Sequence, residues 1–231
     1  LGAEALAAGN TAIDDDSIGA VLVCGPTPTH IDQTEAAAQA GKAIFCEKPI
    51  GLDIKRVEQC IEVVTRTAVP FYLGFMMRFD PSFREVRDGV RAGAIGHVEQ
   101  IIIIGRDPAP PPIEYINQSG GIFRDSMIHS IDIVRWILDE EPSEAFAMGE
   151  CIIDPEIGCA GDVDSTMLML RTPSGTICVL SNARHAPQGA EGCGAQFFGS
   201  KGLLRVGTVY PTATDGFGGN GPLARRGLPR F

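Results

Sequence analysis

The sequence contains no apolar stretch long enough to anchor it in a bilayer. Its longest purely aliphatic run, Ile101 to Ile104, has four residues, whereas a membrane-spanning helix needs about 20. No charged segment followed by an apolar one opens the chain, so we expect neither a leader nor membrane association.

Basic residues are also scarce. The 19 Lys and Arg residues stand against 29 Asp and Glu, which gives a formal charge of −10. Binding to nucleic acid needs a cationic surface that displaces counterions from phosphates, so this balance argues against a nucleic-acid partner. The rest of the composition, 44% hydrophobic and 21% charged, is typical of a globular protein with a sizeable core.

The seven cysteines form no C-x-x-C pair and show no Cys/His spacing typical of a metal site. An odd, scattered set in a chain of this length predicts reduced, mostly buried thiols in a cytoplasmic protein rather than a disulfide scaffold. Cys24 and Cys46 close apolar runs, where cysteine packs as a small hydrophobic residue. We expect no metal centre.

The amino-terminal third alternates short apolar runs with helical segments. Strands are expected at 20–24, 43–46 and 70–75, and helices at 30–40 and 53–67. Strand–helix–strand spacing of this kind predicts right-handed crossovers and a parallel sheet covered on both faces. We place the boundary of this α/β domain near Phe79, so that it comprises residues 1–78.

Beyond that boundary the pattern changes to consecutive strands. We expect helices at 81–92 and 121–138, a Pro-rich loop at 107–119, and strands at 97–106, 144–153, 163–171, 176–182, 195–198 and 202–206. Strands without intervening helices favour an open, mainly antiparallel sheet, so residues 79–206 form an α+β domain in this interpretation. The Gly/Pro-rich tail, residues 207–231, shows no apolar periodicity.

The expected helix at 121–138 carries a polar stripe on an otherwise apolar surface. Asp125, His129, Asp132 and Trp136 fall on one face, with Met127, Ile131, Val134 and Leu138 as the expected core face. One interpretation is a structural Asp/His pair that satisfies itself inside a core. The other is a catalytic pair, in which Asp125 orients His129 as a general base near neutral pH.

Three segments in this order resemble one family. They are Glu47-Lys48-Pro49, Arg78-Phe79-Asp80-Pro81, and Gly120-Gly121 followed by Asp125 and His129. Together they resemble the glucose–fructose oxidoreductase / inositol dehydrogenase / MocA family of NAD(P)-dependent oxidoreductases, over about residues 20–206. The loop Thr27 to His30 and the turn Gly199 to Gly202 narrow the resemblance towards inositol 2-dehydrogenases.

The resemblance implies a partial Rossmann-type domain and a substrate and oligomerisation domain. Lys48, Asp125 and His129 would be catalytic, with Arg78 beside them at the substrate. The cofactor, NAD with NADP left open, would lie against Pro26, Thr27, His30, Glu47 and Lys48, with Pro49 after a cis peptide. The substrate would be a cyclic polyol or sugar whose secondary hydroxyl is oxidised, and the protein would be a dimer or tetramer of identical chains.

The sequence also departs from the family pattern. No G-x-G-x-x-G turn or first βα unit precedes Ala20, and no carboxyl-terminal helix follows Gly202, so we expect a chain shortened at both ends. Met76 or Met77 replaces an expected polar residue, and the loop 186–191 lacks a tyrosine. Two alternatives therefore stay open: a catalytically silent binding or oligomerisation module, and an NADPH-dependent relative similar to a dihydrodiol dehydrogenase.

Overall fold

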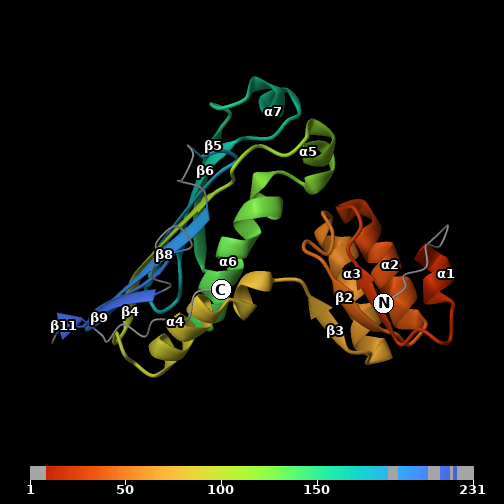
Figure 1. Ribbon diagram of the computed structural model, residues 1–231, viewed down its shortest axis with the longest axis horizontal. Coiled ribbons are helices and arrows are strands. Elements are labelled where there is room, and N and C mark those ends of the chain that lie inside the picture. Colours follow the sequence, from red (N-terminus) through yellow and green to blue (C-terminus); the bar gives the residue numbers. More distant parts are fainter. Residues whose placement is uncertain (1–8, 187–191, 208–213, 219–220, 223–231) are drawn as a thin grey trace. The chain divides into compact units, whose positions relative to one another are not determined.

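The computed structural model describes residues 9–186, 192–207, 214–218 and 221–222 (Figure 1). The chain divides into two compact units, the first formed by residues 1–75 with 118–120 and the second by 76–117 with 121–231. The predicted boundary at Phe79 falls at the end of η2 (Met76–Phe79), the 3-10 turn with which the second unit begins. Most of the loop expected to lack a tyrosine, residues 187–191, and most of the Gly/Pro-rich tail lie outside the described residues.

The first unit is a three-stranded parallel sheet with its connecting helices. In chain order its elements are α1 (Gly9–Ile13), β1 (Ala20–Val23), η1 (Thr27–Thr29), α2 (His30–Gln39), β2 (Ala43–Cys46), α3 (Ile54–Thr67) and β3 (Phe71–Leu73). The strand order is β1-β2-β3, with both pairs parallel. The strand–helix–strand expectation is therefore confirmed, and the carboxyl ends of all three strands lie at one edge.

The described helices cover this sheet on one face, not on both as predicted. Two crossovers of the same hand, taken in sequential strand order, place α2 and α3 on the same side. The row Leu22, Phe45 and Tyr72 runs across the other face, where Leu22 is 71% exposed and the Phe45 and Tyr72 rings stack. The core of the unit lies beneath the helices, around Val23 and Ile44.

The second unit is built on an eight-stranded sheet. Its elements are η2, α4 (Pro81–Arg91), β4 (Val98–Arg106), α5 (Ile113–Ser119), η3 (Phe123–Met127), α6 (Ile128–Leu138), β5 (Glu144–Glu150), α7 (Pro155–Cys159), β6 (Ser165–Arg171), β7 (Ile177–Ala183), β8 (Gly192–Gly199), β9 (Gly202–Gly207), β10 (Thr214–Gly218) and β11 (Gly221–Pro222). The order is β11-β10-β9-β8-β4-β7-β6-β5, and only β4 and β7 pair in parallel. The mainly antiparallel prediction is confirmed.

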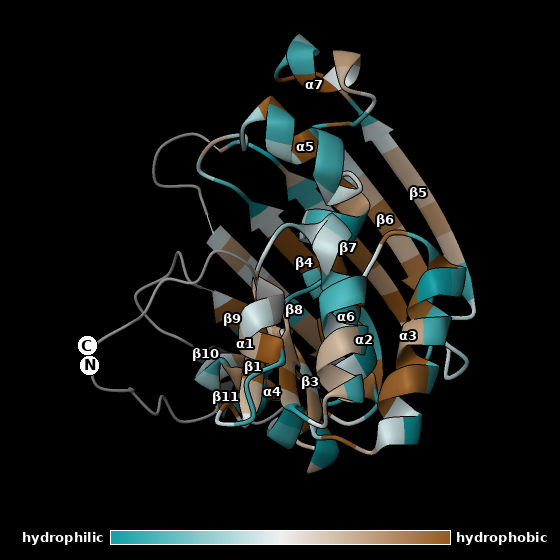
Figure 2. Cartoon of the chain, turned by 90° about the vertical axis from the view of Figure 1, so that its right-hand side faces the viewer, coloured by the Kyte–Doolittle hydropathy of each residue, from teal (hydrophilic) through white to brown (hydrophobic). Residues whose placement is uncertain are grey.

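Helices α4 and α6 cover one face of this sheet and form the core with it. The inward side chains follow the two-residue period of each strand, as Leu168 and Leu170 on β6 and Cys178 and Leu180 on β7 show. Brown segments in Figure 2 mark this apolar content on β4 and β7. The part of α6 that is fully buried centres on Ile133, Val134 and Ile137, whereas Ile131 and Leu138 are only partly buried.

Three local expectations were wrong. The Pro-rich stretch 107–119 is not all loop, because the Pro112 carbonyl accepts from the amides of Tyr115 and Ile116 and starts α5. The strand expected to reach residue 153 ends at Glu150 and is followed by α7. The helix expected over 121–138 begins as a π-helical turn, η3, before α6.

The cysteines form no disulfide, but Cys24 and Cys159 are exposed rather than buried.

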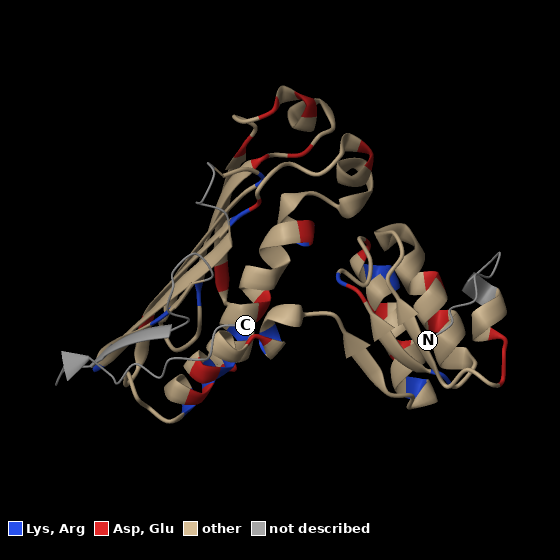
Figure 3. Cartoon of the chain, in the orientation of Figure 1, with Lys and Arg blue, Asp and Glu red and all other residues tan. Residues whose placement is uncertain are grey.

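The opposite face of the large sheet carries exposed apolar side chains. Phe146 and Met148 of β5 lie opposite Met169 and Met167 of β6, and they are 58% and 65% exposed. Charged residues gather mainly on the helices, while the strands are mostly tan in Figure 3. No helix in the described ranges has the length and apolar character needed to span a membrane.

Asp164 anchors the segment that joins β5 to α7. Its buried carboxylate accepts from the backbone amides of Ile152 (3.0 Å), Ile153 (2.7 Å) and Asp154 (2.9 Å). Burial opposes ionisation, but the three donors outweigh it and lower the pKa of Asp164.

We expect Asp164→Asn to lower the free energy of unfolding by about 2 kcal/mol at neutral pH, because hydrogen bonds to a charged acceptor are lost. Since folding lowers the pKa, the stabilisation is complete above the ordinary value near 3.8 and is lost as the pH falls through the folded-state value. Urea unfolding of the wild type and the variant at pH values from 7 to 3 measures this stabilisation. Asp139→Asn, at an exposed left-handed position, is the control; a difference between wild type and Asp164→Asn that grows at low pH would contradict the account.

Candidate active site

The corner after β2 presents the predicted lysine. Lys48 is half-buried and is followed by a cis peptide bond to Pro49. The Lys48 amide donates to the carboxylate of Glu47 at 3.2 Å, which fixes the turn locally. A Cβ added at Gly74 would lie 3.0 Å from the same carboxylate, so the chain leaving β3 passes close to Glu47. The cis bond that the resemblance implied is confirmed.

His30 lies at the start of α2 and joins two turns of the first unit. The ring is 2% exposed, with Nδ1 at 2.8 Å from the Pro49 carbonyl and Nε2 at 2.8 Å from the Gly25 carbonyl. Both ring nitrogens thus contact backbone oxygens, and the histidine ties the turn after β1 to the corner after β2. Its predicted contact with the cofactor remains a prediction.

The predicted cofactor residues of the first unit gather at the carboxyl edge of the small sheet. Exposed Pro26 and half-buried Thr27 lie after β1, and Glu47 and Lys48 lie after β2, at the edge where open parallel sheets bind ligands. Gly74 lies so close to Glu47 that a side chain at position 74 would collide with the Glu47 carboxylate. Among the described residues of this unit, no glycine-rich turn opens a helix to hold the pyrophosphate.

Asp125 lies in the π-helical turn of the second unit. One of its carboxylate oxygens accepts from the Tyr115 hydroxyl at 2.7 Å, and the other contacts Nη1 of Arg184 at 3.3 Å. Burial, together with the hydrogen bond to Asp125, raises the pKa of Tyr115 to about 12. The phenol therefore stays protonated and donates at neutral pH. His129, half-buried in the first turn of α6, follows Asp125 by four residues.

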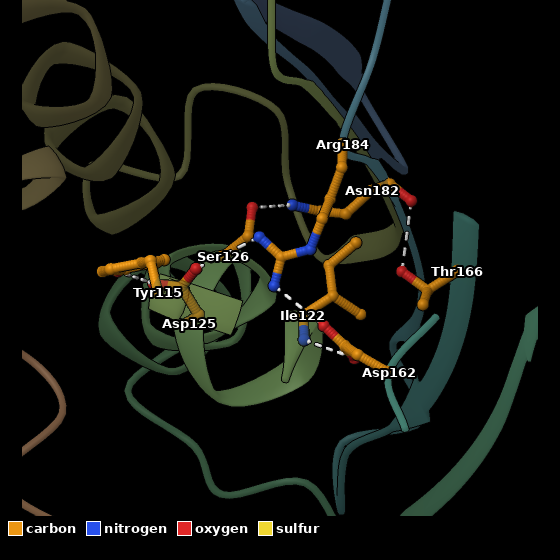
Figure 4. A network of polar contacts seen from close by, with 8 residues as sticks. All are labelled: Tyr115, Ile122, Asp125, Ser126, Asp162, Thr166, Asn182 and Arg184. Carbon is orange, nitrogen blue, oxygen red and sulfur yellow. Dashed lines mark hydrogen bonds and ion pairs between the residues drawn. The ribbon is translucent and has the colours of Figure 1, made fainter. Parts of the chain in front are cut away.

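Arg184 is the centre of this polar cluster (Figure 4). The side chain is 1% exposed, and its second amino group contacts Asp162 at 3.0 Å. The other oxygen of Asp162 accepts from the Ile122 amide at 3.0 Å. Next to it, Asn182 Nδ2 donates to Ser126 Oγ at 2.9 Å. The cluster thus holds the chain at three positions around the π turn.

Four residues of this cluster were not predicted from the sequence: Tyr115, Asp162, Asn182 and Arg184. A signal existed for two of them, because the inner face of β7 reads Cys178, Leu180, Asn182 and then Arg184, two polar residues where the period predicts apolar ones. Asp162 and Tyr115 come from loops and a short helix, and only the tertiary structure brings them to Asp125.

The polar stripe on the helix divides into two parts. Asp132 is 2% exposed and is held by Arg78 in a bidentate pair, with Nε at 2.8 Å and Nη2 at 2.5 Å. Trp136 lies under the guanidinium of Arg87, at 4.4 Å from the ring centroid. Asp132 is thus a paired structural acid. Asp80, two residues after Arg78, caps α4 by accepting from the amides of Ser82 and Phe83.

The predicted residues therefore belong to two units: Pro26, Thr27, His30, Glu47 and Lys48 to the first, and Arg78, Asp125 and His129 to the second. In the described part of the chain, no three His, Cys, Asp or Glu side chains are grouped to hold a metal ion. The second unit combines a half-buried histidine with an acid held by a buried arginine.

The fold and the site define the class: a Rossmann-type parallel sheet followed by an open-sheet domain that carries an Asp/His pair. The GFO/IDH/MocA C-terminal domain model matches residues 83–205, and the model of the oxidoreductase family with an NAD-binding Rossmann fold matches residues 2–75. The chain belongs to the GFO/IDH/MocA oxidoreductase family.

Individual relatives agree with this membership. An inositol 2-dehydrogenase of Rhizobium meliloti is 46% identical over 88% of this chain and 62% of its own, and a myo-inositol 2-dehydrogenase of Thermotoga maritima is 43% identical over 87% and 60%. The structure of a scyllo-inositol dehydrogenase of Lactobacillus casei with NAD(H) and scyllo-inositol has a TM-score of 0.80 and 31% identity, covering 93% of this chain and 65% of that one. The chain spans about three fifths of the length of the curated relatives it matches.

Two glycines with the same backbone conformation differ in what surrounds them. Gly121 has a φ of +83°, and a Cβ added there would lie 2.8 Å from Asp162 Oδ1. Gly161 has a φ of +80° and open space around it. Glycine is thus favoured at position 121 for two reasons, the left-handed backbone and the closeness of Asp162.

We expect Gly161→Ala to cost about 1 kcal/mol of unfolding free energy through left-handed strain, and Gly121→Ala to cost at least about 1 kcal/mol more because it also displaces Asp162. Urea unfolding of both variants measures the difference. Equal losses of unfolding free energy in the two variants would show that Asp162 moves aside at no cost in stability.

Proposed function

We propose that this protein is an NAD-dependent dehydrogenase that oxidises a secondary hydroxyl of a cyclic polyol, with an inositol as the substrate class. The observation that carries the proposal is the placement of Asp125 in η3 and of His129 four residues later in the first turn of α6, in a chain whose relatives are named inositol dehydrogenases. NAD is the preferred cofactor because the matching family model is NAD-binding and the Lactobacillus casei relative holds NAD(H).

Each residue has a distinct task in this proposal. His129 accepts the hydroxyl proton, and Asp125 orients its ring and stabilises the imidazolium that forms. Lys48 places a positive charge beside the developing alkoxide. When bound, the nicotinamide supplies the hydride acceptor. Pro26, Thr27, His30 and Glu47 shape the cofactor edge, and Arg78, whose charge Asp132 already balances, offers hydrogen bonds to a neutral polyol.

Replacing His129 with Ala is expected to reduce turnover by about 10²- to 10⁴-fold, because the general base is lost while the half-buried position tolerates a smaller side chain. NADH formation with myo-inositol, scyllo-inositol and a set of sugars measures it at 340 nm. His97→Ala, at an exposed position outside the site, is the control.

Unchanged turnover in His129→Ala would refute the mechanism. Two other outcomes would refute the function itself: the absence of saturable NADH binding to the wild-type chain would favour the silent module, and NADPH-dependent carbonyl reduction without polyol oxidation would favour a dihydrodiol dehydrogenase-like activity.

The proposal includes an assembly of identical chains, a dimer or a tetramer, through the open face of the large sheet. Four large apolar residues of β5 and β6 lie exposed there: Phe146, Met148, Met167 and Met169. A contiguous apolar surface of this kind marks an interaction site, and a second copy offers the same surface in self-complementary form. A cytoplasmic location accords with cysteines that stay free throughout the described ranges.

Met167→Glu is expected to shift the protein towards monomer, because a charge would be buried at the centre of the contact. Sedimentation velocity at several concentrations measures the shift. Ile54→Glu, an equally exposed apolar position on α3, serves as the matched control. If both variants sediment like the wild type, the open face of the sheet is not the contact between chains.

A further inference from the structure

We propose that Asn182 of β7 and Arg184, which directly follows this strand, are together with Asp162 positioning residues that hold the π turn η3 and thereby fix the carboxylate of Asp125 beside His129. This inference rests on the proposed function, because it concerns the acid that would orient the base. It assigns a task to residues outside the predicted site.

The first support comes from the inner face of β7. Asn182 packs where Gly105 of the neighbouring β4 leaves space, since a Cβ on Gly105 would lie 3.0 Å from Asn182 Nδ2. From this position the amide reaches Ser126 Oγ at 2.9 Å. A side chain of the sheet thus holds one residue of the π turn directly.

The second support is the division of one guanidinium between two acids. Arg184 contacts Asp125 with Nη1 at 3.3 Å and Asp162 with Nη2 at 3.0 Å. Asp162 in turn accepts from the Ile122 amide, directly before the turn. Positions 122, 125 and 126 are therefore tied to one buried cluster, and a bridge of this width needs the planar fork of arginine.

A π turn needs such support because it is less stable than an α-helix and occurs mostly as a short insertion at functional sites. Without the ties, the segment can relax towards α-helical winding. That change would rotate Asp125 relative to His129, which lies in the first turn of the regular helix α6. The cluster thus selects the winding that the catalytic pair requires.

The cluster also sets the charge beside the base. Arg184, Asp125 and Asp162 together carry one positive and two negative charges, and the Tyr115 hydroxyl adds a neutral donor. The negative charge of Asp125, held near the ring, favours the imidazolium that forms when His129 takes the proton. A shift of the acid away from the histidine removes this assistance.

Two variants test the proposal, Arg184→Lys and Ser126→Ala. Lysine keeps the buried charge but cannot bridge both acids, and Ser126→Ala removes a neutral contact, so it covers the case in which Arg184→Lys does not fold. Arg135→Lys is the matched control, because Arg135 makes a bidentate pair with Glu141 on the surface. Hydrogen exchange of residues 120–130, kcat, KM and NADH affinity are measured for each.

We expect faster exchange in 120–130 and a kcat reduced about 10- to 100-fold in Arg184→Lys, with a smaller loss in Ser126→Ala, because misplacement of a catalytic group mainly lowers turnover. The acidic limb of the kcat profile should move to lower pH, since the imidazolium loses support. NADH affinity should stay within about twofold, because the predicted cofactor residues belong to the other unit, and KM should change less than kcat.

Unchanged exchange in both variants overturns the proposal whatever the activity, and changed exchange with unchanged kcat overturns the positioning role. If the wild-type chain oxidises no polyol, the proposed function fails separately, and the exchange data still decide whether the cluster holds the turn.

Discussion

The second unit is organised around one constraint, the burial of the Arg184 guanidinium. A charge removed from water costs several kcal/mol unless opposite charges and hydrogen bonds surround it. Asp125 and Asp162 supply the opposite charges and accept from Nη1 and Nη2, whereas Nε has no hydrogen-bond partner among the described residues. The two acids come from segments far apart in the sequence, the π turn and the loop that leads into β6. The end of β7, the start of the long helix and that loop must therefore assemble together, and the candidate acid is fixed by the same contacts that satisfy the arginine.

The elements governed by local signals could be predicted from the sequence. Helix α3 begins where the Asp53 side chain accepts from two backbone amides, and α4 begins in the same way after Asp80. Strands β6 and β7 follow two-residue alternation and lie within two residues of their predicted positions, whereas β5 ends three residues earlier than predicted and β10 and β11 were not predicted. In these segments the side chain that stops or starts an element is a neighbour in sequence.

The elements that prediction missed depend on contacts between distant residues. The π turn cannot be distinguished from an α-helix by apolar periodicity, because five residues are too few, and its ties come from Asn182 and Arg184 about 60 positions later. Helix α5 was hidden in a Pro-rich stretch. At the site, spacing and resemblance identified Asp125 and His129, whereas Asp162 carries no local pattern that distinguishes it from any surface acid.

Two buried acids on the same face of the helix differ in how their charges are paired. Asp132 has its own arginine in a one-to-one bidentate pair, so its charge is balanced and the contact fastens α6 to η2. Asp125 shares its arginine with Asp162, one turn before His129. Spacing alone places both acids on the helix face of the histidine. Their partners separate them, because the one-to-one pair makes Asp132 a structural contact, whereas in the mechanism proposed above Asp125 stabilises the imidazolium that forms on His129.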